Sequence, residues 1–181
     1  MMAPYGKIIL LLASAVAAAL LLSFALPRLA PAASIVDFDS VREAALAASQ
    51  LREFRLPSPA RVEVLPATLK IGDVTLQASK VRLVWECSSP AYNEDLGTWS
   101  LWANGTHAGV ESGVYVKDEG DTLLIYFFSS SSRSIARLSY RLSPLPFKAV
   151  LRDGSVTFDG QAVYEFSGWR EVRVLKAEVS G

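Results

Sequence analysis

The chain of 181 residues contains one cysteine, Cys87, and one histidine, His107. A single cysteine excludes a disulfide within the chain, and the apolar alternation around Cys87 predicts a buried side chain. A zinc or copper site at His107 would need carboxylates or Cys87 recruited from elsewhere, because no ligand spacing surrounds it. Nothing near Cys87 resembles a cysteine-hydrolase signature. We therefore expect His107 in a surface loop and assign no metal or cofactor.

The sequence also lacks an excess of charge of either sign. Lys and Arg together number 18, Asp and Glu also number 18, and the formal net charge is +0. Nucleic-acid binding therefore has no electrostatic footprint. Methionine occurs only at positions 1 and 2, and asparagine only at positions 93 and 104. Scarcity of such thermolabile residues is typical of thermophile-like, archaeal-like composition.

Catalytic motifs are missing as well. There is no glycine-rich phosphate loop. Type I signal peptidases, whose membrane-anchored β-rich layout is similar, carry a Ser-Met pair at the nucleophile, whereas this chain has no Met after residue 2. Glu86, Glu94, Asp95 and Glu111 are candidates for a glycosidase-type carboxylate pair. Acidic residues near a loop are more typical of a solvated surface, so we predict no catalytic residue.

What the sequence does contain is one long apolar run, residues 8–26, without charge, Pro or Gly. As a helix it would extend about 28 Å, close to the ~30 Å hydrocarbon core of a bilayer. With residues 1–7 as a cytoplasmic leader carrying Lys7, it predicts a signal anchor with an exported C-terminal part. A cleaved signal is the alternative, because Ala30-Pro31-Ala32 offers a cleavage site near Ala32.

A third interpretation rests on layout. A short leader, an apolar helix, an amphipathic helix and a β domain resemble the organisation of type IV pilins. That resemblance implies a filament subunit. Processing in that family needs a charged residue followed by a small one, whereas here the order is Gly6-Lys7.

Residues 27–39 contain prolines and small residues and predict a linker. Residues 40–55 predict an amphipathic helix, with a Ser-x-x-Glu capping box beginning at Ser40. Apolar residues recur there at helical spacing from Val41 to Leu51. We expect this helix to pack on the β domain.

Residues 61–181 alternate with a period of two and are interrupted by turn signals, which predicts a β domain. Hairpin turns are predicted at Gly72-Asp73, Asp153-Gly154 and Asp159-Gly160, and a break at Pro144 and Pro146. The clearest strand, residues 80–87, places Val81, Leu83, Trp85 and Cys87 on one face. Eight to ten short strands predict an antiparallel, Ig-like β-sandwich, with a barrel as the alternative.

Residues 122–128 are apolar on both faces, so this strand is either covered twice or presents one face to a partner. Leu124, Tyr126 and Phe128 are candidate interaction residues on one face, together with Trp102 from another strand. In residues 169–179 the apolar positions change parity, which predicts a β-bulge near Val174.

Asn104-Gly105-Thr106 is an N-x-Thr sequon in a predicted loop, which makes Asn104 a candidate glycosylation site. The export segment, the β pattern and the absent chemistry together favour a non-enzymatic, membrane-anchored or secreted cell-surface protein that acts by protein–protein contact. A subunit of a filament or surface layer and a membrane-tethered hydrolase are the two alternatives. The expected partners are the lipid bilayer, through residues 8–26, and a protein or a second copy of the chain.

Overall fold

The structure, a computed structural model, describes residues 35–181. Strands form 71% of this part, so the class is mainly β with one short helix. The elements in chain order are α2 (Phe38–Ser49), β1 (Phe54–Ile71), β2 (Val74–Glu86), β3 (Tyr92–Asp95), β4 (Trp99–Ala103), β5 (His107–Ser112), β6 (Val114–Asp118), β7 (Thr122–Ser129), β8 (Ser134–Phe158) and β9 (Gln161–Ser180).

The predicted apolar segment, residues 8–26, lies outside the described residues, as do the leader and most of the linker. Within residues 35–181, no helix has the length and apolar character needed to cross a membrane.

The helix α2 differs from its predicted bounds at both ends. Its N-cap is Asp37, whose Oδ1 accepts a hydrogen bond from the Ser40 N–H (2.9 Å). The capping box predicted to begin at Ser40 is therefore wrong, because Ser40 lies in the first turn and its hydroxyl donates to Asp37 (2.6 Å). This bond holds the pKa of the Asp37 carboxyl below its ordinary value. The helix ends at Ser49, before residue 55, because β1 already begins at Phe54.

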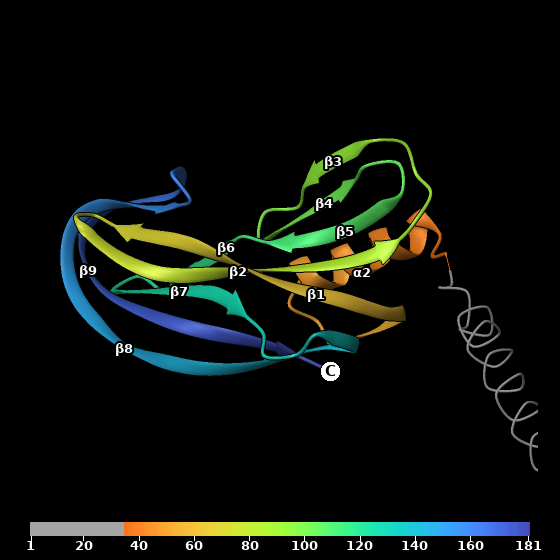
Figure 1. The fold of residues 1–181 in the computed structure, drawn as a ribbon. Coiled ribbons are helices and arrows are strands. Elements are labelled where there is room, and N and C mark those ends of the chain that lie inside the picture. The colour runs from red at the N-terminus through yellow and green to blue at the C-terminus, as the bar shows by residue number, and fades with distance from the viewer. Residues whose placement is uncertain (1–34) are drawn as a thin grey trace, which may run out of the picture. The chain divides into compact units, whose positions relative to one another are not determined.

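The nine strands form one hydrogen-bonded sheet in the order β3-β4-β5-β2-β1-β8-β9-β7-β6. The predicted Ig-like sandwich consists of two stacked sheets, whereas here one open sheet curls into a half-barrel (Figure 1). The long strands β8 and β9 bend along their length, as twisted strands of this length do. Their curvature brings β7 against β2, where the hydroxyl of Ser79 donates to the carbonyl of Phe128 (2.7 Å).

The turn predicted at Gly72-Asp73 is confirmed, because Ile71 pairs with Val74 across it. Gly72 has a φ of 56°, a backbone conformation that glycine adopts without steric cost. The long hairpin of β1 and β2 follows directly from this turn.

The strand β8 continues through Pro144, Pro146 and Asp153, so the breaks predicted there are wrong. Its pairing with β9 instead shifts register near Pro144 and near Asp153. Such irregularities accommodate residues that cannot fill a regular ladder position without ending the strand. The chain reverses at the last predicted turn, Asp159-Gly160, where both residues have positive φ.

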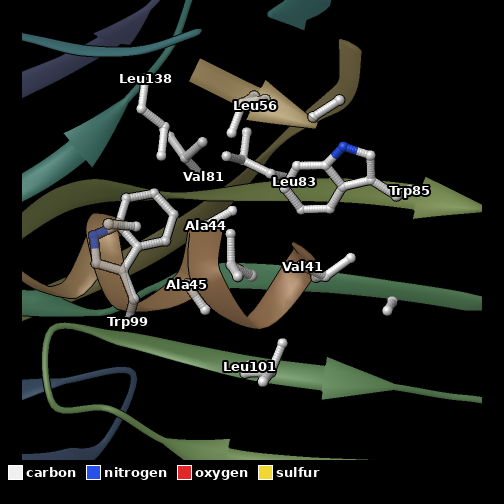
Figure 2. Close-up of a cluster of buried hydrophobic side chains, with 14 of the residues drawn as sticks. Val41, Ala44, Ala45, Leu56, Val81, Leu83, Trp85, Trp99, Leu101 and Leu138 are labelled. Carbon is white, nitrogen blue, oxygen red and sulfur yellow. The ribbon is translucent and has the colours of Figure 1, made fainter. Parts of the chain in front are cut away.

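The described residues form two hydrophobic cores. The first, which we call the helix-covered core, lies under α2; Figure 2 shows Ala44 and Ala45 of the helix beside Leu83 and Trp99. The second, which we call the distal core, lies inside the curl of the sheet. Its buried members include Leu69, Ile71, Val114, Leu123, Ile125, Val156, Phe158, Phe166, Val172 and Val174.

The two cores lie on opposite faces of the sheet. Along β1 and β2 the pairing is unbroken from Arg61 to Ile71, so side-chain direction alternates without a slip. Val81 and Leu83 of β2 enter the helix-covered core, whereas Leu76 and Ala78, of the other parity, pack on the distal core. The hairpin therefore buries one face near α2 and the other face near its tip.

The same change of buried face explains the parity change in β9. Val172 and Val174 belong to the distal core, whereas Ala177 and Val179 belong to the helix-covered core. The predicted bulge in β9 is wrong, because β7 and β9 pair without a shift across this segment. The irregularity there lies instead in β8, after Pro144.

Candidate interaction surface

The candidate surface is the face of β8, β9, β7 and β6 that points away from the distal core. We call it the outer face. Cross-strand pairing places its members side by side: Arg152 pairs with Trp169, and Leu124 pairs with Lys117 and Arg173. The apolar and aromatic side chains on it are Tyr115, Leu124, Tyr126, Leu142, Val150, Trp169 and Leu175.

Three large apolar side chains of the outer face are strongly exposed. Trp169 exposes 64% of its surface, Val150 61% and Leu142, which pairs with Ala177, 54%. Leu124, Tyr126 and Leu175 are half-buried by their strand neighbours. Charged residues are interspersed with these side chains, because Lys148, Arg173 and Lys117 share one row of the sheet with Leu124. Aromatic residues together with arginine are enriched at protein interfaces, so this mixture is typical of an interaction site.

Basic side chains lie between the apolar ones on the outer face. Lys148 Nζ lies 3.2 Å from the Glu171 carboxylate, and Arg173 donates a hydrogen bond to the same carboxylate. The Arg173 bond, followed by the Lys148 bond, holds the pKa of Glu171 below its ordinary value, so Glu171 stays ionised at neutral pH. Arg152 lies opposite Trp169 on this face. Lys148 and Arg173 share Glu171, and Arg152 Nε lies 3.6 Å from the Asp153 carboxylate. Three cations therefore face two carboxylates, and the β8–β9 part of the outer face carries a small positive excess.

Two tyrosines form the edge of the outer face. The rings of Tyr115 in β6 and Tyr126 in β7 lie 5.6 Å apart, centroid to centroid, at an interplanar angle of 37°. Burial raises the pKa of Tyr126, so its phenol remains neutral at physiological pH. The pair therefore adds a flat, uncharged aromatic surface next to Leu124.

The structure brings together two of the four predicted interaction residues. Leu124 and Tyr126 both lie on the outer face. Phe128 has the same parity, but this end of β7 belongs to the helix-covered core. Phe128 is fully buried there, and its ring centroid lies 5.1 Å from that of Trp99. Trp102 lies on the opposite face of the sheet, because it belongs to the parity of β4 that points away from Trp99 and Leu101.

Trp102 has a distinct environment. Its ring lies over Gly109, where an added Cβ would approach the ring to 2.9 Å and the Leu83 carbonyl to 2.3 Å. The Arg82 guanidinium lies 5.5 Å from the ring centroid, within the range of a cation–π interaction. The position of Trp102 therefore requires glycine at position 109.

Asn104 lies in the exposed turn between β4 and β5. Its Oδ1 accepts hydrogen bonds from the His107 N–H (2.9 Å) and the Thr106 N–H (3.3 Å). Thr106 Oγ1 lies 3.0 Å from His107 Nδ1. The sequon is thus accessible on a tight turn, and glycosylation of Asn104 stays a prediction.

The predicted cysteine and carboxylate candidates are buried or take part in ion pairs and hydrogen bonds within the domain. Cys87 is buried in the helix-covered core, as predicted, and burial raises its pKa. Glu111 pairs with Arg82 (2.5 Å) and Lys80 (3.5 Å), whereas Glu94 accepts a bond from the Tyr92 hydroxyl (2.8 Å). Among residues 35–181, no three His, Cys, Asp or Glu side chains converge to hold a metal ion.

Val150 and Trp169, the two most exposed apolar residues of the outer face, are not among the four predicted interaction residues. The signal was present: Trp169, Glu171 and Arg173 alternate with the buried Val172 and Val174, so their side chains share a face. The pairing of β8 with β9 along most of their length places Val150 beside these residues, which the alternation within β9 alone does not show.

Comparison of the chain with protein-family models, curated proteins and solved structures finds no match in any of the three.

Proposed function

We propose that this chain is a non-enzymatic cell-surface protein that binds a partner protein through its outer face. In this proposal residues 8–26 either anchor the domain to the membrane or are removed by cleavage near Ala32, which leaves the β domain outside the cytoplasm. The observation that carries the binding role is the set of large apolar side chains on the outer face that no other part of residues 35–181 covers, of which Trp169 and Val150 are the most exposed.

The chemistry of the outer face defines the partner. Aromatic residues dominate binding energy at protein interfaces, and basic side chains among them favour an acidic counterpart. The expected partner therefore presents apolar side chains with carboxylates between them. These carboxylates would lie against Lys148, Arg152 and Arg173.

Site-specific photocrosslinking tests the proposal. A photoreactive phenylalanine analogue replaces Trp169 or Leu124 in the full chain, and intact cells are irradiated. We expect one discrete crosslinked protein from both positions. The matched control is Gln77 in β2, which is exposed on the same sheet face in a polar surrounding. Equal crosslinking from Gln77, or none from Trp169 and Leu124, contradicts the binding role.

Localisation has a separate test. Protease treatment of intact cells should remove the β domain, because the proposal places it outside the membrane. Full protection of the domain contradicts this. The N-terminal residue of the mature protein then distinguishes an anchor from cleavage near Ala32.

A filament or surface-layer subunit is the second candidate, since a second copy of the chain could contact the outer face. The apolar face of α2 is buried in the helix-covered core, so lateral contacts from this helix would use its exposed side, which includes Leu46. Electron microscopy of shed surface material distinguishes the two: polymers that contain the chain favour the filament, and a 1:1 complex with another protein favours the leading proposal.

A further inference from the structure

A cleft of about 690 Å³ opens on the other side of the sheet from the outer face. Three parts of the chain form its walls: the β3–β4 segment, the beginning of β6, and the hairpin tip that joins β8 to β9. The β3–β4 segment and this hairpin tip both rise above the sheet in Figure 1. Lys80 of β2 contributes to the lining between these walls.

One wall of the cleft is a free sheet edge. β6 is the last strand of the sheet and pairs only with β7. The Glu119 N–H donates to the Thr122 carbonyl (2.8 Å), which makes that pair a hydrogen-bonded one. Hydrogen-bonded and non-bonded pairs alternate in an antiparallel ladder. Counting back along β6, the main-chain groups of Val116 and Val114 therefore point away from β7.

Val114 and Val116 both line the cleft, so this free edge forms part of its wall. Within residues 35–181, no hydrogen bond engages the N–H or C=O of Val116 from outside the β6–β7 pair. An unpaired edge of this kind is a template for an added strand. The cleft supplies room for one.

The side chains around the edge define what the strand would carry. Val163 at the hairpin tip is 43% exposed and lines the cleft together with Phe158, so one wall is apolar. Lys80 is occupied by Asp159 (2.5 Å) and Glu111 (3.5 Å). Asp95 accepts a bond from the Gly97 N–H (2.8 Å) but has no basic partner among the described residues.

We propose that this cleft binds an extended peptide segment of a partner protein, which adds as a strand along the free edge of β6. The main chain of the peptide pairs with Val116. Apolar side chains of the peptide contact the wall at Val163, and a basic side chain pairs with Asp95. This site is separate from the outer face and goes beyond the function proposed above.

Selection of phage-displayed random nonapeptides on the full chain in detergent micelles tests the inference. We expect enriched peptides that alternate apolar residues and contain a basic one. Val116→Pro removes the outward N–H, which an edge strand tolerates, and also replaces a half-buried side chain that packs on the distal core. Since one lost hydrogen bond corresponds to about a tenfold loss of affinity, binding to this variant should weaken by about that factor. The control Trp169→Ser, on the outer face, should bind the peptides like the native chain.

Failure to enrich any peptide, or equal affinity for Val116→Pro, overturns the proposal. Hydrogen exchange provides a readout that needs no variant. The Val116 amide should exchange fast in the free chain and slowly with saturating peptide, whereas the Tyr115 amide, bonded to β7, should not change. Unchanged exchange at Val116 overturns the proposal, as does protection that rises with protein concentration alone, which assigns the edge to a second copy.

Discussion

The tip of the β1–β2 hairpin and the β8-β9-β7-β6 strands expose the same face of one sheet but carry different side chains there. On the hairpin this face presents Thr68, Lys70, Thr75 and Gln77, all exposed and polar. On the other strands it is the outer face, with the exposed Trp169 near the end of its β8–β9 part. Polar side chains at the hairpin tip are stable in contact with water. We propose that a partner protein shields the apolar side chains of the outer face from water.

A third part of the same face shows what cover achieves. Near α2 the face carries Leu83 and Phe128, and both are fully buried in the helix-covered core. The outer face resembles this part in side-chain character but has no helix over it among the described residues. Comparison of the covered and uncovered parts therefore yields matched experiments.

The largest difference is expected from Leu83→Ala against Leu124→Ala. Leu83 is fully buried, so its truncation should lower the free energy of unfolding by about 3 kcal/mol. Leu124 is half-buried, and its truncation should cost about 1 kcal/mol or less. Urea denaturation of the full chain in detergent measures both. Equal losses would mean that the outer face is structural core.

Removal of the helix cap should have an intermediate effect. Asp37→Ala leaves the Ser40 N–H without its acceptor, and we expect a loss of about 1 kcal/mol of stability. Binding of a hydrophobic dye should rise as the cover over Leu83 loosens. Asp39→Ala, in the exposed first turn, is the control. An unchanged melting curve for Asp37→Ala would show that the cap does not hold α2 in place.

Trp169→Ser should separate binding from stability. Trp169 is mostly exposed, so the free energy of unfolding should change by no more than about 0.5 kcal/mol. Photocrosslinking from position 124 should nevertheless fall sharply, because aromatic anchors dominate interface energy. Gln77→Ser should alter neither measurement. If Trp169→Ser lowers stability strongly and leaves crosslinking unchanged, Trp169 has a structural role and is not part of the binding surface.

The smallest effect concerns pH. The folded-state pKa of Glu171 is depressed by Arg173 and Lys148, so its contribution is present above the ordinary value of 4.5 and is lost as pH falls through the folded pKa. Glu171→Gln should therefore make stability fall less steeply below about pH 4.5. Glu165→Gln, on the same strand, is the control. Identical acid unfolding curves for the native chain and Glu171→Gln would show that these ion pairs are too solvated to contribute.

Part of the candidate surface could be predicted from the sequence. The alternation in residues 122–128 identifies Leu124 and Tyr126, because a strand with two apolar faces needs two covers. The same alternation placed Phe128 with them, since parity alone does not tell where along a strand the cover ends. Trp102 could not be separated from Leu124 by pattern, because opposite faces of different strands have equivalent alternation.

The sequence by itself determined the mainly β class, the helix before the sheet, the turns at Gly72 and Asp159, and the burial of Cys87, because these depend on local periodicity and turn chemistry. Only the tertiary structure decided that the sheet is single and curled and that its buried face changes along the strands. The accumulated twist of long strands controls that change. Side chains still alternate along each strand, but the face that is buried at one end of the strand is exposed at the other.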